Sequence, residues 1–408
     1  MKTAGFELAS VSKQFTATAI MQLANRGKLS YQDPLTKYIP ELPFEKVTIE
    51  NLLRHTSGIP EFLGFDEKWF DKTKINKNGD LLNVLKTHID TLLFPPNERS
   101  YYSNTNYILL ALIVEKVSEL SFEKYIGRNV FSPSEMKNSM VISGRSLKNP
   151  FQNYAIGMAY DPSKNGFVSV DEFPSYNFLT YFDGIGGPYG ISSTVKDLYA
   201  WDQAISKETV LRNKEFQESI STGKLNNDSL TVGMMDSYSG FGWMFMDKTE
   251  NEKMHFHSGG WPGYQTLIVR DPSKKQFVAL LLNKMNLIGV MPIMAAVDKI
   301  LKNDTPPKVS IEEFGKGVVL MEFQINPLIG TYAFTQNKNL KYHITVNDEG
   351  KLFAQLTGQP AAKVYATSEL ELFYTIVDAT IKFQKQDDEI HSLNLFQNGM
   401  ELVFEKEK

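Results

Sequence analysis

Cysteine is absent from the 408-residue sequence, which excludes disulfides, thiolate metal sites and a cysteine nucleophile. A strong charge of either sign is also missing, because 43 Lys and Arg residues stand against 47 Asp and Glu residues and leave a formal net charge of −4. Such a near-balance gives no reason to expect a nucleic acid or an anionic membrane as a partner. No apolar run approaches the roughly 18 residues of a membrane-spanning helix. We therefore expect a globular protein without a transmembrane segment.

The first residues lack the apolar core of a secretory signal peptide. We expect a cytoplasmic protein or, if a leader ahead of these residues has been removed, a periplasmic or otherwise extracytoplasmic one. A chain without cysteine suits either redox environment. Nothing in the sequence indicates an oligomeric state.

The length predicts more than one domain, because 408 residues exceed what one ordinary hydrophobic core holds. Strand patterns follow helical ones from about residue 240, and a helix over residues 290–301 is predicted to close a first domain of residues 1–303. Residues 304–321, which contain two adjacent prolines, have the composition of a linker. In residues 322–408, apolar and polar residues alternate in short runs, which predicts a small antiparallel β-barrel or sandwich.

Ser10 and Lys13 begin an apolar pattern that predicts a helix over residues 10–26, with Gly27 placed to end it. Residues three apart share a helical face, so the Lys13 amine can lie against the Ser10 hydroxyl, as a serine nucleophile requires. The helix N-terminus would also direct backbone N–H groups toward that oxygen. By itself this spacing equally describes a capped helix with a surface lysine.

Two further segments carry residues of the same chemical kind. Tyr102-Ser103-Asn104 precedes a mostly apolar helix predicted over residues 106–120, and His257-Ser258-Gly259-Gly260 ends a predicted strand. Gly184–Gly187 is predicted to be a turn beside the cleft, since the lysine and the preceding strand of a phosphate-binding loop are missing.

In this order, Ser-x-x-Lys, Tyr-x-Asn and a strand-borne His-Ser-Gly resemble the serine β-lactamase and penicillin-binding-protein superfamily. The branch most similar contains class C β-lactamases, D-alanyl-D-alanine carboxypeptidases, D-aminopeptidases and related esterases. The resemblance spans about residues 6–300. It implies an α+β, β-lactamase-like fold, in which an antiparallel sheet flanked by helices is joined to a helical subdomain. Residues 322–408 resemble the lipocalin-like appendage of some members.

The resemblance also implies roles for the residues that match the motifs. Ser10 would be the nucleophile. Lys13 and Tyr102 would together act as the base and as the proton donor to the leaving group, and the resemblance does not say which of the two is the base. Asn104 would hydrogen-bond the amide carbonyl of the substrate. The remaining substrate-binding residues would be His257, Ser258, Gly259 and Gly260, and backbone N–H groups of residues 10 and 260 would form the oxyanion hole. No cofactor or metal is implied, and the partner would be a small-molecule or peptide substrate.

His257 stands where β-lactamases of this superfamily usually carry lysine. Histidine is mostly neutral at pH 7, so it holds a substrate carboxylate more weakly than an ammonium group does. We therefore expect an ester or an N-terminal D-amino-acid amide as the substrate, rather than a β-lactam or a C-terminal D-Ala-D-Ala peptide.

Other interpretations stay open. The protein could keep this fold as a binding or assembly protein that turns over little. His255 and His257 share a strand face and could bind a metal, although no neighbouring acidic residue or histidine completes a ligand set. His55, in a His-Thr-Ser-Gly turn, is expected to order that turn by hydrogen bonding. The Gly-x-Ser-x-Gly elbow of α/β-hydrolases does not occur.

Overall fold

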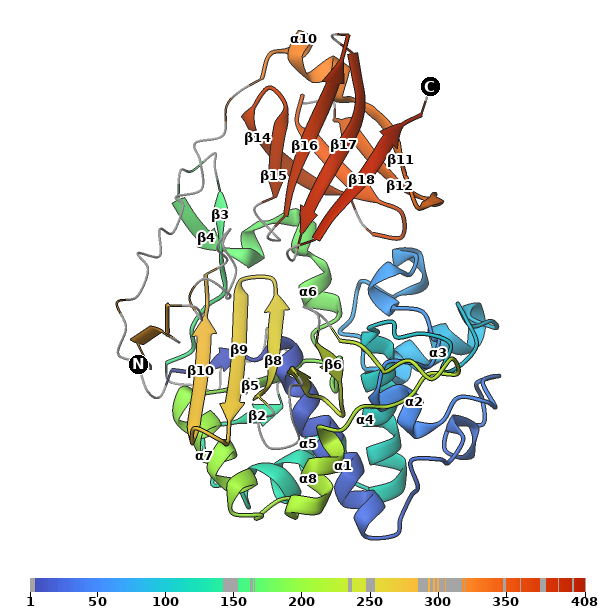
Figure 1. Ribbon diagram of the computed structural model, residues 1–408, viewed down its shortest axis with the longest axis vertical. Coiled ribbons are helices and arrows are strands. Elements are labelled where there is room, and N and C mark those ends of the chain that lie inside the picture. Colours follow the sequence, from blue (N-terminus) through green and yellow to red (C-terminus); the bar gives the residue numbers. More distant parts are fainter. Residues whose placement is uncertain are drawn as a thin grey trace. The chain divides into compact units, whose positions relative to one another are not determined.

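The computed structural model (Figure 1) describes residues 4–141, 153–161, 164, 166–233, 237–246, 254–284, 293, 296–297, 299–300, 305, 318, 320–347, 350–359, 361–374, 379–387, 389–397 and 400–407. The helix predicted over residues 290–301 and the linker predicted over residues 304–321 lie largely outside them. The chain divides into two compact units. The first comprises Met1–Phe62, Asp66–Ile156 and Phe178–Asn283, and the second comprises Leu63–Phe65, Gly157–Asn177 and Lys284–Lys408. The domain limits at residues 303 and 322 stay a prediction.

Two helices form the centre of the first unit, α1 (Lys13–Asn25) and α4 (Asn104–Ser118), which pack against each other. Every residue of α1 from Lys13 to Leu23 is buried, and so is every residue of α4 from Thr105 to Val114. A helix that is apolar on all faces must lie inside a protein, which accounts for the burial of the mostly apolar helix predicted over residues 106–120. The other helices of this unit are α2 (Ile49–Leu53), α3 (Asn78–His88), α5 (Phe122–Ile126), α6 (Phe178–Tyr181), α7 (Val195–Ser206) and α8 (Asn213–Ser219).

An antiparallel sheet makes up the other part of the first unit, with the strand order β10-β9-β8-β7-β6. Its strands are β6 (Tyr238–Ser239), β7 (Met244–Met246), β8 (Met254–Trp261), β9 (Tyr264–Asp271) and β10 (Gln276–Leu282). Helix α7 packs on β10 (Figure 1). A smaller sheet has the order β1-β5-β2, with β1 (Phe6–Glu7), β5 (Ile191–Ser193) and β2 (Met140–Val141). Strand β7 begins at Met244, two residues after Gly242, which has a left-handed φ of +70°.

The start of α1 differs from the prediction. Ala9–Ser12 form a 3-10 turn and the α-helix begins at Lys13, so Ser10 precedes the helix instead of opening it. Ala9 has a φ of +49°, a conformation that non-glycine residues rarely adopt. The helix ends at Asn25, one residue before the predicted limit, and Gly27 lies just beyond it with a φ of +68°.

The second unit contains a closed eight-stranded barrel, in which each strand pairs antiparallel with the next and β11 pairs with β18. Its strands are β11 (Gly330–Phe334), β12 (Asn337–Val346), β13 (Leu352–Leu356), β14 (Ala362–Ser368), β15 (Glu371–Tyr374), β16 (Ala379–Gln386), β17 (Glu389–Gln397) and β18 (Met400–Lys406). Alternate apolar residues such as Ile344, Ile381 and Leu393 fill the interior. A short helix, α10 (Glu322–Ile325), precedes the barrel, and the hairpin of β3 (Met158–Asp161) and β4 (Gly166–Ser169) belongs to the same unit. Of the two architectures that the alternation allowed, the barrel is confirmed.

Candidate active site

The amine of Lys13 is fully buried and held by three oxygen atoms. Its Nζ lies 3.1 Å from Oγ of Ser10, 2.7 Å from Oδ1 of Asn104 and 3.1 Å from the carbonyl oxygen of Pro188. Burial lowers the pKa of Lys13 to about 7, and the Glu61 carboxylate opposes that shift. Near neutral pH the group is therefore present both as an ammonium ion and as a free amine.

Ser10 is partly exposed in the turn before α1, where a nucleophile can reach both a substrate and the Lys13 amine. The turn is anchored on β5, because the backbone N–H of Leu8 donates to the carbonyl of Ile191 at 2.8 Å. The left-handed Ala9 follows directly. Strained backbone of this kind persists where the surrounding structure imposes it, often at functional sites.

Gly259 lets strand β8 pass close to the turn that carries Ser10. A Cβ atom at this position would lie 2.5 Å from the Leu8 carbonyl oxygen and 3.0 Å from Cβ of Ala9. The same contact is fixed by Thr266, on the neighbouring strand β9, whose hydroxyl donates to the Leu8 carbonyl at 2.7 Å. Any side chain at position 259 would push the strand away from the turn that carries Ser10.

The Gly187-Pro188 segment brings a backbone carbonyl to Lys13. Gly187 has a φ of +112°, and a Cβ there would lie 2.3 Å from the carbonyl oxygen of Tyr107 on α4. Its own carbonyl accepts a hydrogen bond from Thr16 on α1 at 2.7 Å. The segment is thereby wedged between the two central helices. Sequence motifs did not identify the Pro188 carbonyl, because a backbone atom carries no residue signature.

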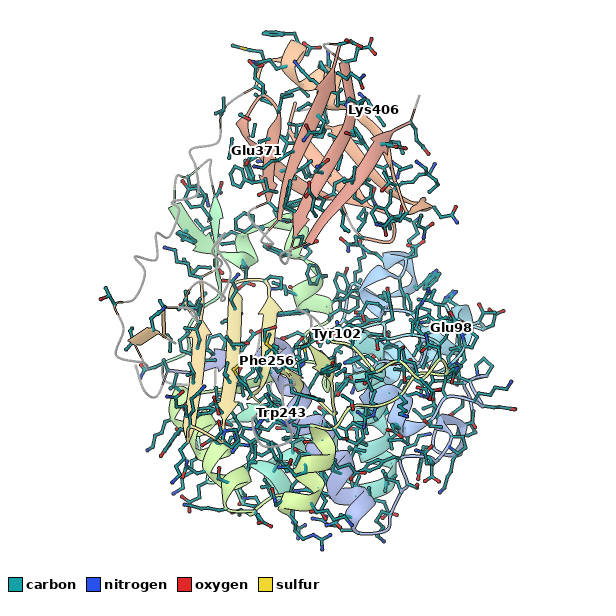
Figure 2. The ribbon with its side chains drawn as sticks, viewed as in Figure 1. Glu98, Tyr102, Trp243, Phe256, Glu371 and Lys406 are labelled. Atoms are coloured by element: carbon teal, nitrogen blue, oxygen red, sulfur yellow. The ribbon has the colours of Figure 1, made fainter. Side chains whose placement is uncertain are left out.

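Tyr102 (labelled in Figure 2) is half-buried, with its hydroxyl out of contact with solvent, and Nζ of Lys13 lies 4.8 Å from the centre of its ring. Burial raises the pKa of the Tyr102 phenol above its usual value of 10. A contact with the Ser10 side chain, looser than a full hydrogen bond, opposes this shift, and the Glu61 carboxylate adds to it. At neutral pH the phenol keeps its proton.

His55 stacks on Tyr102, with the ring centres 4.4 Å apart. Its Nδ1 accepts a hydrogen bond from the backbone N–H of Ser103 at 3.1 Å, and its carbonyl accepts one from the N–H of Tyr101 at 2.8 Å. Burial holds the pKa of His55 well below its usual range, and the neighbouring Lys13 and His257 side chains contribute to this shift. The side-chain hydrogen bond of the neutral His55 thus holds the Tyr102 segment in place, whereas the prediction was that it orders the turn of residues 55–58.

His257 lies buried on β8, and its Nδ1 is 2.6 Å from the carbonyl oxygen of Ser258. A carbonyl oxygen only accepts, so this nitrogen carries the proton and Nε2 is left as an acceptor. Burial, with a smaller contribution from Lys13, lowers the pKa of His257 to about 3. His257 is therefore uncharged at neutral pH.

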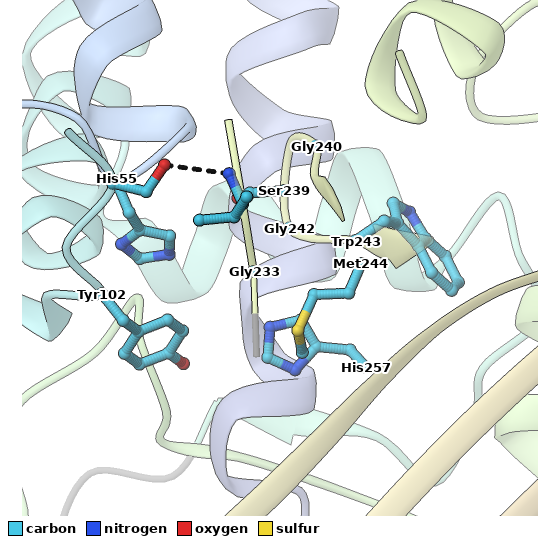
Figure 3. A pocket seen from close by; sticks show the side chains of 11 residues that line it. His55, Tyr102, Gly233, Ser239, Gly240, Gly242, Trp243, Met244 and His257 are labelled. Carbon is cyan, nitrogen blue, oxygen red and sulfur yellow. Dashed lines mark hydrogen bonds between the residues drawn. The ribbon is translucent and has the colours of Figure 1, made fainter. Parts of the chain in front are cut away.

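Tyr102 and His257 line a pocket of about 110 Å³. Figure 3 shows the Tyr102 hydroxyl and the His257 ring on facing sides of it, with Trp243 and Met244 completing one wall. The side chain of His55 borders the same space. The lining thus combines one phenol, two neutral imidazoles and apolar surface.

Asn104 is the first residue of α4, and both ends of its side-chain amide are engaged. Oδ1 faces Lys13, while Nδ2 donates to Oε1 of Glu61 at 3.0 Å. An amide NH2 group has two N–H bonds, and the second of them is not used in these contacts. Glu61 was not predicted, because it lies 43 residues before the helix that it contacts and belongs to none of the motifs.

The remaining predicted substrate-binding residues, Ser258 and Gly260, also lie on β8. Gly260 follows Gly259 on β8 and is exposed. Ser258 takes part through its carbonyl, which orients His257.

Within the described ranges no three His, Asp or Glu side chains gather as a metal site, and His255 instead contacts the guanidinium of Arg270 at 3.2 Å. Among the helices that the structure describes, none is long and apolar enough to cross a bilayer.

Comparisons with known proteins agree with the fold. Residues 3–300 match the Beta-lactamase family. The chain is 32% identical to penicillin-binding protein 4* of Bacillus subtilis over 398 aligned residues. The alignment covers 97% of this chain and 86% of that protein. A penicillin-binding protein from Bacillus halodurans is 27% identical, with a TM-score of 0.61 over 74% of this chain and 87% of that one. The octameric penicillin-binding protein homologue from Pyrococcus abyssi is 22% identical, with a TM-score of 0.62 over 99% and 89%, and shows likeness of fold.

The predicted fold class is confirmed by these matches, and the C-terminal barrel by the structure itself. With a family match over most of its length and a relative at 32% identity, the chain belongs to the Beta-lactamase family and is a hydrolase of the serine β-lactamase and penicillin-binding-protein superfamily.

Proposed function

We propose that the protein hydrolyses an ester or amide through a covalent acyl-enzyme on Ser10. The observation that carries this proposal is the Lys13 amine, buried, near its titration point at neutral pH and 3.1 Å from the Ser10 hydroxyl. A buried amine with a lowered pKa is the kind of group that activates a hydroxyl nucleophile.

The contacts of Lys13 suit a neutral amine that acts as the base. Its two N–H groups donate to Asn104 and Pro188, which leaves the lone pair directed at the Ser10 hydroxyl. When Oγ attacks the substrate carbonyl, the serine proton passes to Nζ, and the resulting ammonium ion still has an oxygen acceptor for each of its three N–H groups. Tyr102 is a neutral phenol at this stage, so of the two candidates for the base we favour Lys13.

The negative charge of the tetrahedral intermediate would fall on the former carbonyl oxygen. Backbone N–H groups of Ser10 and Gly260 would hold that oxygen, and losing one such donor typically costs about 2.7–4 kcal/mol of transition-state stabilisation. As the bond to the leaving group breaks, the Tyr102 hydroxyl gives that group a proton and recovers one from the Lys13 ammonium. Water then attacks the ester carbonyl, its proton passes through Tyr102 and Lys13 to Oγ of Ser10 as the bond between Oγ and the acyl carbon breaks, and the free acid leaves.

The neutral state of His257 supports the substrate class. With Nδ1 committed to the Ser258 carbonyl, the imidazole offers a lone pair and no positive charge. A carboxylate beside it would go without a charged partner, whereas an amine or amide N–H would find an acceptor. We therefore favour an ester or a D-amino-acid amide over β-lactams and peptides that end in a carboxylate.

The test is reaction of the full chain with a fluorophosphonate, followed by intact mass, in wild type and Ser10→Ala. We expect one adduct on the wild type and none on the variant. A panel of p-nitrophenyl esters, D-aminoacyl amides and nitrocefin would then rank the substrates, with nitrocefin last.

The alternative is a binding or assembly protein that keeps the fold and turns over little. The complete barrel of the second unit, whose residues take no part in the Lys13 contacts, is the feature that favours it. A wild-type protein that takes no label and is inert across the panel would decide for this alternative.

A further inference from the structure

Glu61 caps helix α4 from a distant loop. One of its carboxylate oxygens accepts a hydrogen bond from the backbone N–H of Asn104, and the other accepts one from Nδ2 of the same residue at 3.0 Å. The residue in the usual capping position, Ser103, makes no side-chain cap. An acidic group at a helix N-terminus satisfies an unpaired N–H and complements the helix dipole.

The neighbours of Glu61 fix its position. The Thr105 hydroxyl donates to the carbonyl of Pro60 at 2.7 Å and accepts from the backbone N–H of Phe62 at 2.9 Å. The residues on either side of Glu61 are thus tied to the first turn of α4. The carboxylate is therefore held against Asn104 by the chain around it.

This contact determines which way the Asn104 amide faces. A carboxylate only accepts, so the NH2 group must turn toward Glu61, and the amide oxygen must then face Lys13. Without Glu61 the amide could rotate and present its NH2 group to the lysine, where it would compete with the Ser10 proton for the amine.

Glu61 also supplies the negative charge that acts on Lys13. The titratable groups around the lysine are Tyr102, Tyr107, His55, His257 and Glu61. Burial keeps both tyrosines protonated and both histidines neutral near pH 7. The Glu61 carboxylate is the group among them that favours the ammonium form.

We propose that Glu61 is a positioning residue of the hydrolase site, which orients the Asn104 amide toward Lys13 and places a negative charge where it acts on the lysine amine. The proposal rests on the function proposed for Ser10 and Lys13. Glu61 acts through Asn104 and by its charge, so its effects on geometry and on protonation can be separated.

The test compares Glu61→Gln with Glu61→Asp in the full chain. Fluorophosphonate labelling rates are measured from about pH 5.5 to 9.5, where the acidic limb reports the protonation of the base. For Glu61→Gln we expect the limb to move down by about one pH unit, because an opposite charge is removed. We also expect the plateau rate to fall about tenfold, because a charged hydrogen bond to Asn104 is lost. Glu61→Asp keeps the charge, so its limb should stay in place while its rate falls.

A second measurement does not depend on activity. NMR titration of ¹³C-labelled lysine, with the Lys13 signal assigned from Lys13→Met, should give a lower pKa for Lys13 in Glu61→Gln than in wild type. The matched control is Glu98→Gln, which removes an exposed carboxylate near the Tyr102 segment (Figure 2) and should leave both readouts unchanged.

An unmoved Lys13 titration in folded Glu61→Gln overturns the proposal, as does an equal loss of rate in both variants with the limb unmoved. The latter pattern would indicate a merely structural cap. An unlabelled wild type contradicts the proposed function instead, and the titration then still decides the effect of Glu61 on Lys13.

Discussion

Two buried cations in the first unit, Lys13 and Arg270, have opposite surroundings. Arg270 on β9 is 5% exposed and forms an ion pair with Asp202 of α7 at 2.5 Å, with further contacts to His255 and Ser206. Lys13 is 0% exposed, and the three oxygens around its amine are all uncharged.

The difference separates a structural charge from a reactive one. A buried charge beside its counter-ion stays charged and joins the elements that carry the two partners, here α7 and the sheet. A buried amine without a direct counter-ion lowers its pKa instead, and a free amine can then accept a proton near neutral pH. Both side chains are buried, so burial alone does not determine which of them keeps its charge. The presence or absence of a direct counter-ion does.

Removing Lys13 should give the largest effect on chemistry. We expect Lys13→Met to lower the fluorophosphonate labelling rate by about a thousandfold, since general bases contribute factors of roughly 10²–10⁴. The melting temperature should stay the same or rise, because a buried amine without a direct counter-ion is replaced by an apolar chain of similar length. A variant that melts far below wild type would show that Lys13 stabilises the fold, contrary to this comparison.

Removing Arg270 should do the reverse. Arg270→Met leaves Asp202 buried without its partner, and breaking such a pair costs about 3–5 kcal/mol of unfolding free energy. Urea denaturation would measure that loss. The labelling rate per folded molecule should stay within about twofold of wild type, as for substitutions remote from the reacting atoms. A large loss of labelling in the folded variant would place Arg270 in the active site.

Gly259→Ala tests the position of the nucleophile with the Lys13 contacts left in place. The added Cβ would meet the Leu8 carbonyl and shift β8 from the Ser10 turn, so we expect labelling to fall by about a hundredfold, as when one oxyanion donor is lost. Gly79→Ala is the matched control. Its Cβ has open space within α3, and the change should stabilise the helix by up to about 1 kcal/mol without affecting labelling. Labelling at the wild-type rate in Gly259→Ala would contradict the close approach.

The smallest expected effect is on stability as the pH changes. Between pH 7 and 10.5 the unfolded chain keeps a proton on Lys13 that the folded chain has lost, so the unfolding free energy rises with pH in this window. Below pH 7 both states are protonated, and the cost of burying the ammonium is present in full. In urea titrations, the unfolding free energy of wild type should rise by about 2 kcal/mol between pH 7 and pH 9, compared with that of Lys13→Met. A flat difference would mean that Lys13 keeps its usual pKa.

Sequence reasoning succeeded where one periodic pattern determines the structure. The apolar residues of α4 and the alternation of residues such as Ile344 and Leu393 indicate buried faces directly. The motifs around Ser10, Tyr102 and His257 identified segments that the structure brings to one place.

Other parts of the site had no signal of this kind. The carboxylate of Glu61 and the carbonyl of Pro188 reach Lys13 only through the folded path of the chain. The turn at Ala9 replaces the first turn of the expected helix, because the strand contacts of Leu8 hold the chain in a conformation that local propensity disfavours.

Closure of the barrel has a consequence for how the second unit can meet other molecules. Because β11 is hydrogen-bonded to β18, the ladder runs round without a free margin on which a foreign strand could be added. The β3–β4 hairpin of the same unit lies outside this closed ladder. Recognition by the barrel itself is left to its outward side chains and connecting loops. Those positions can vary without disturbing the interior, so the same scaffold can acquire new partners while its core stays unchanged.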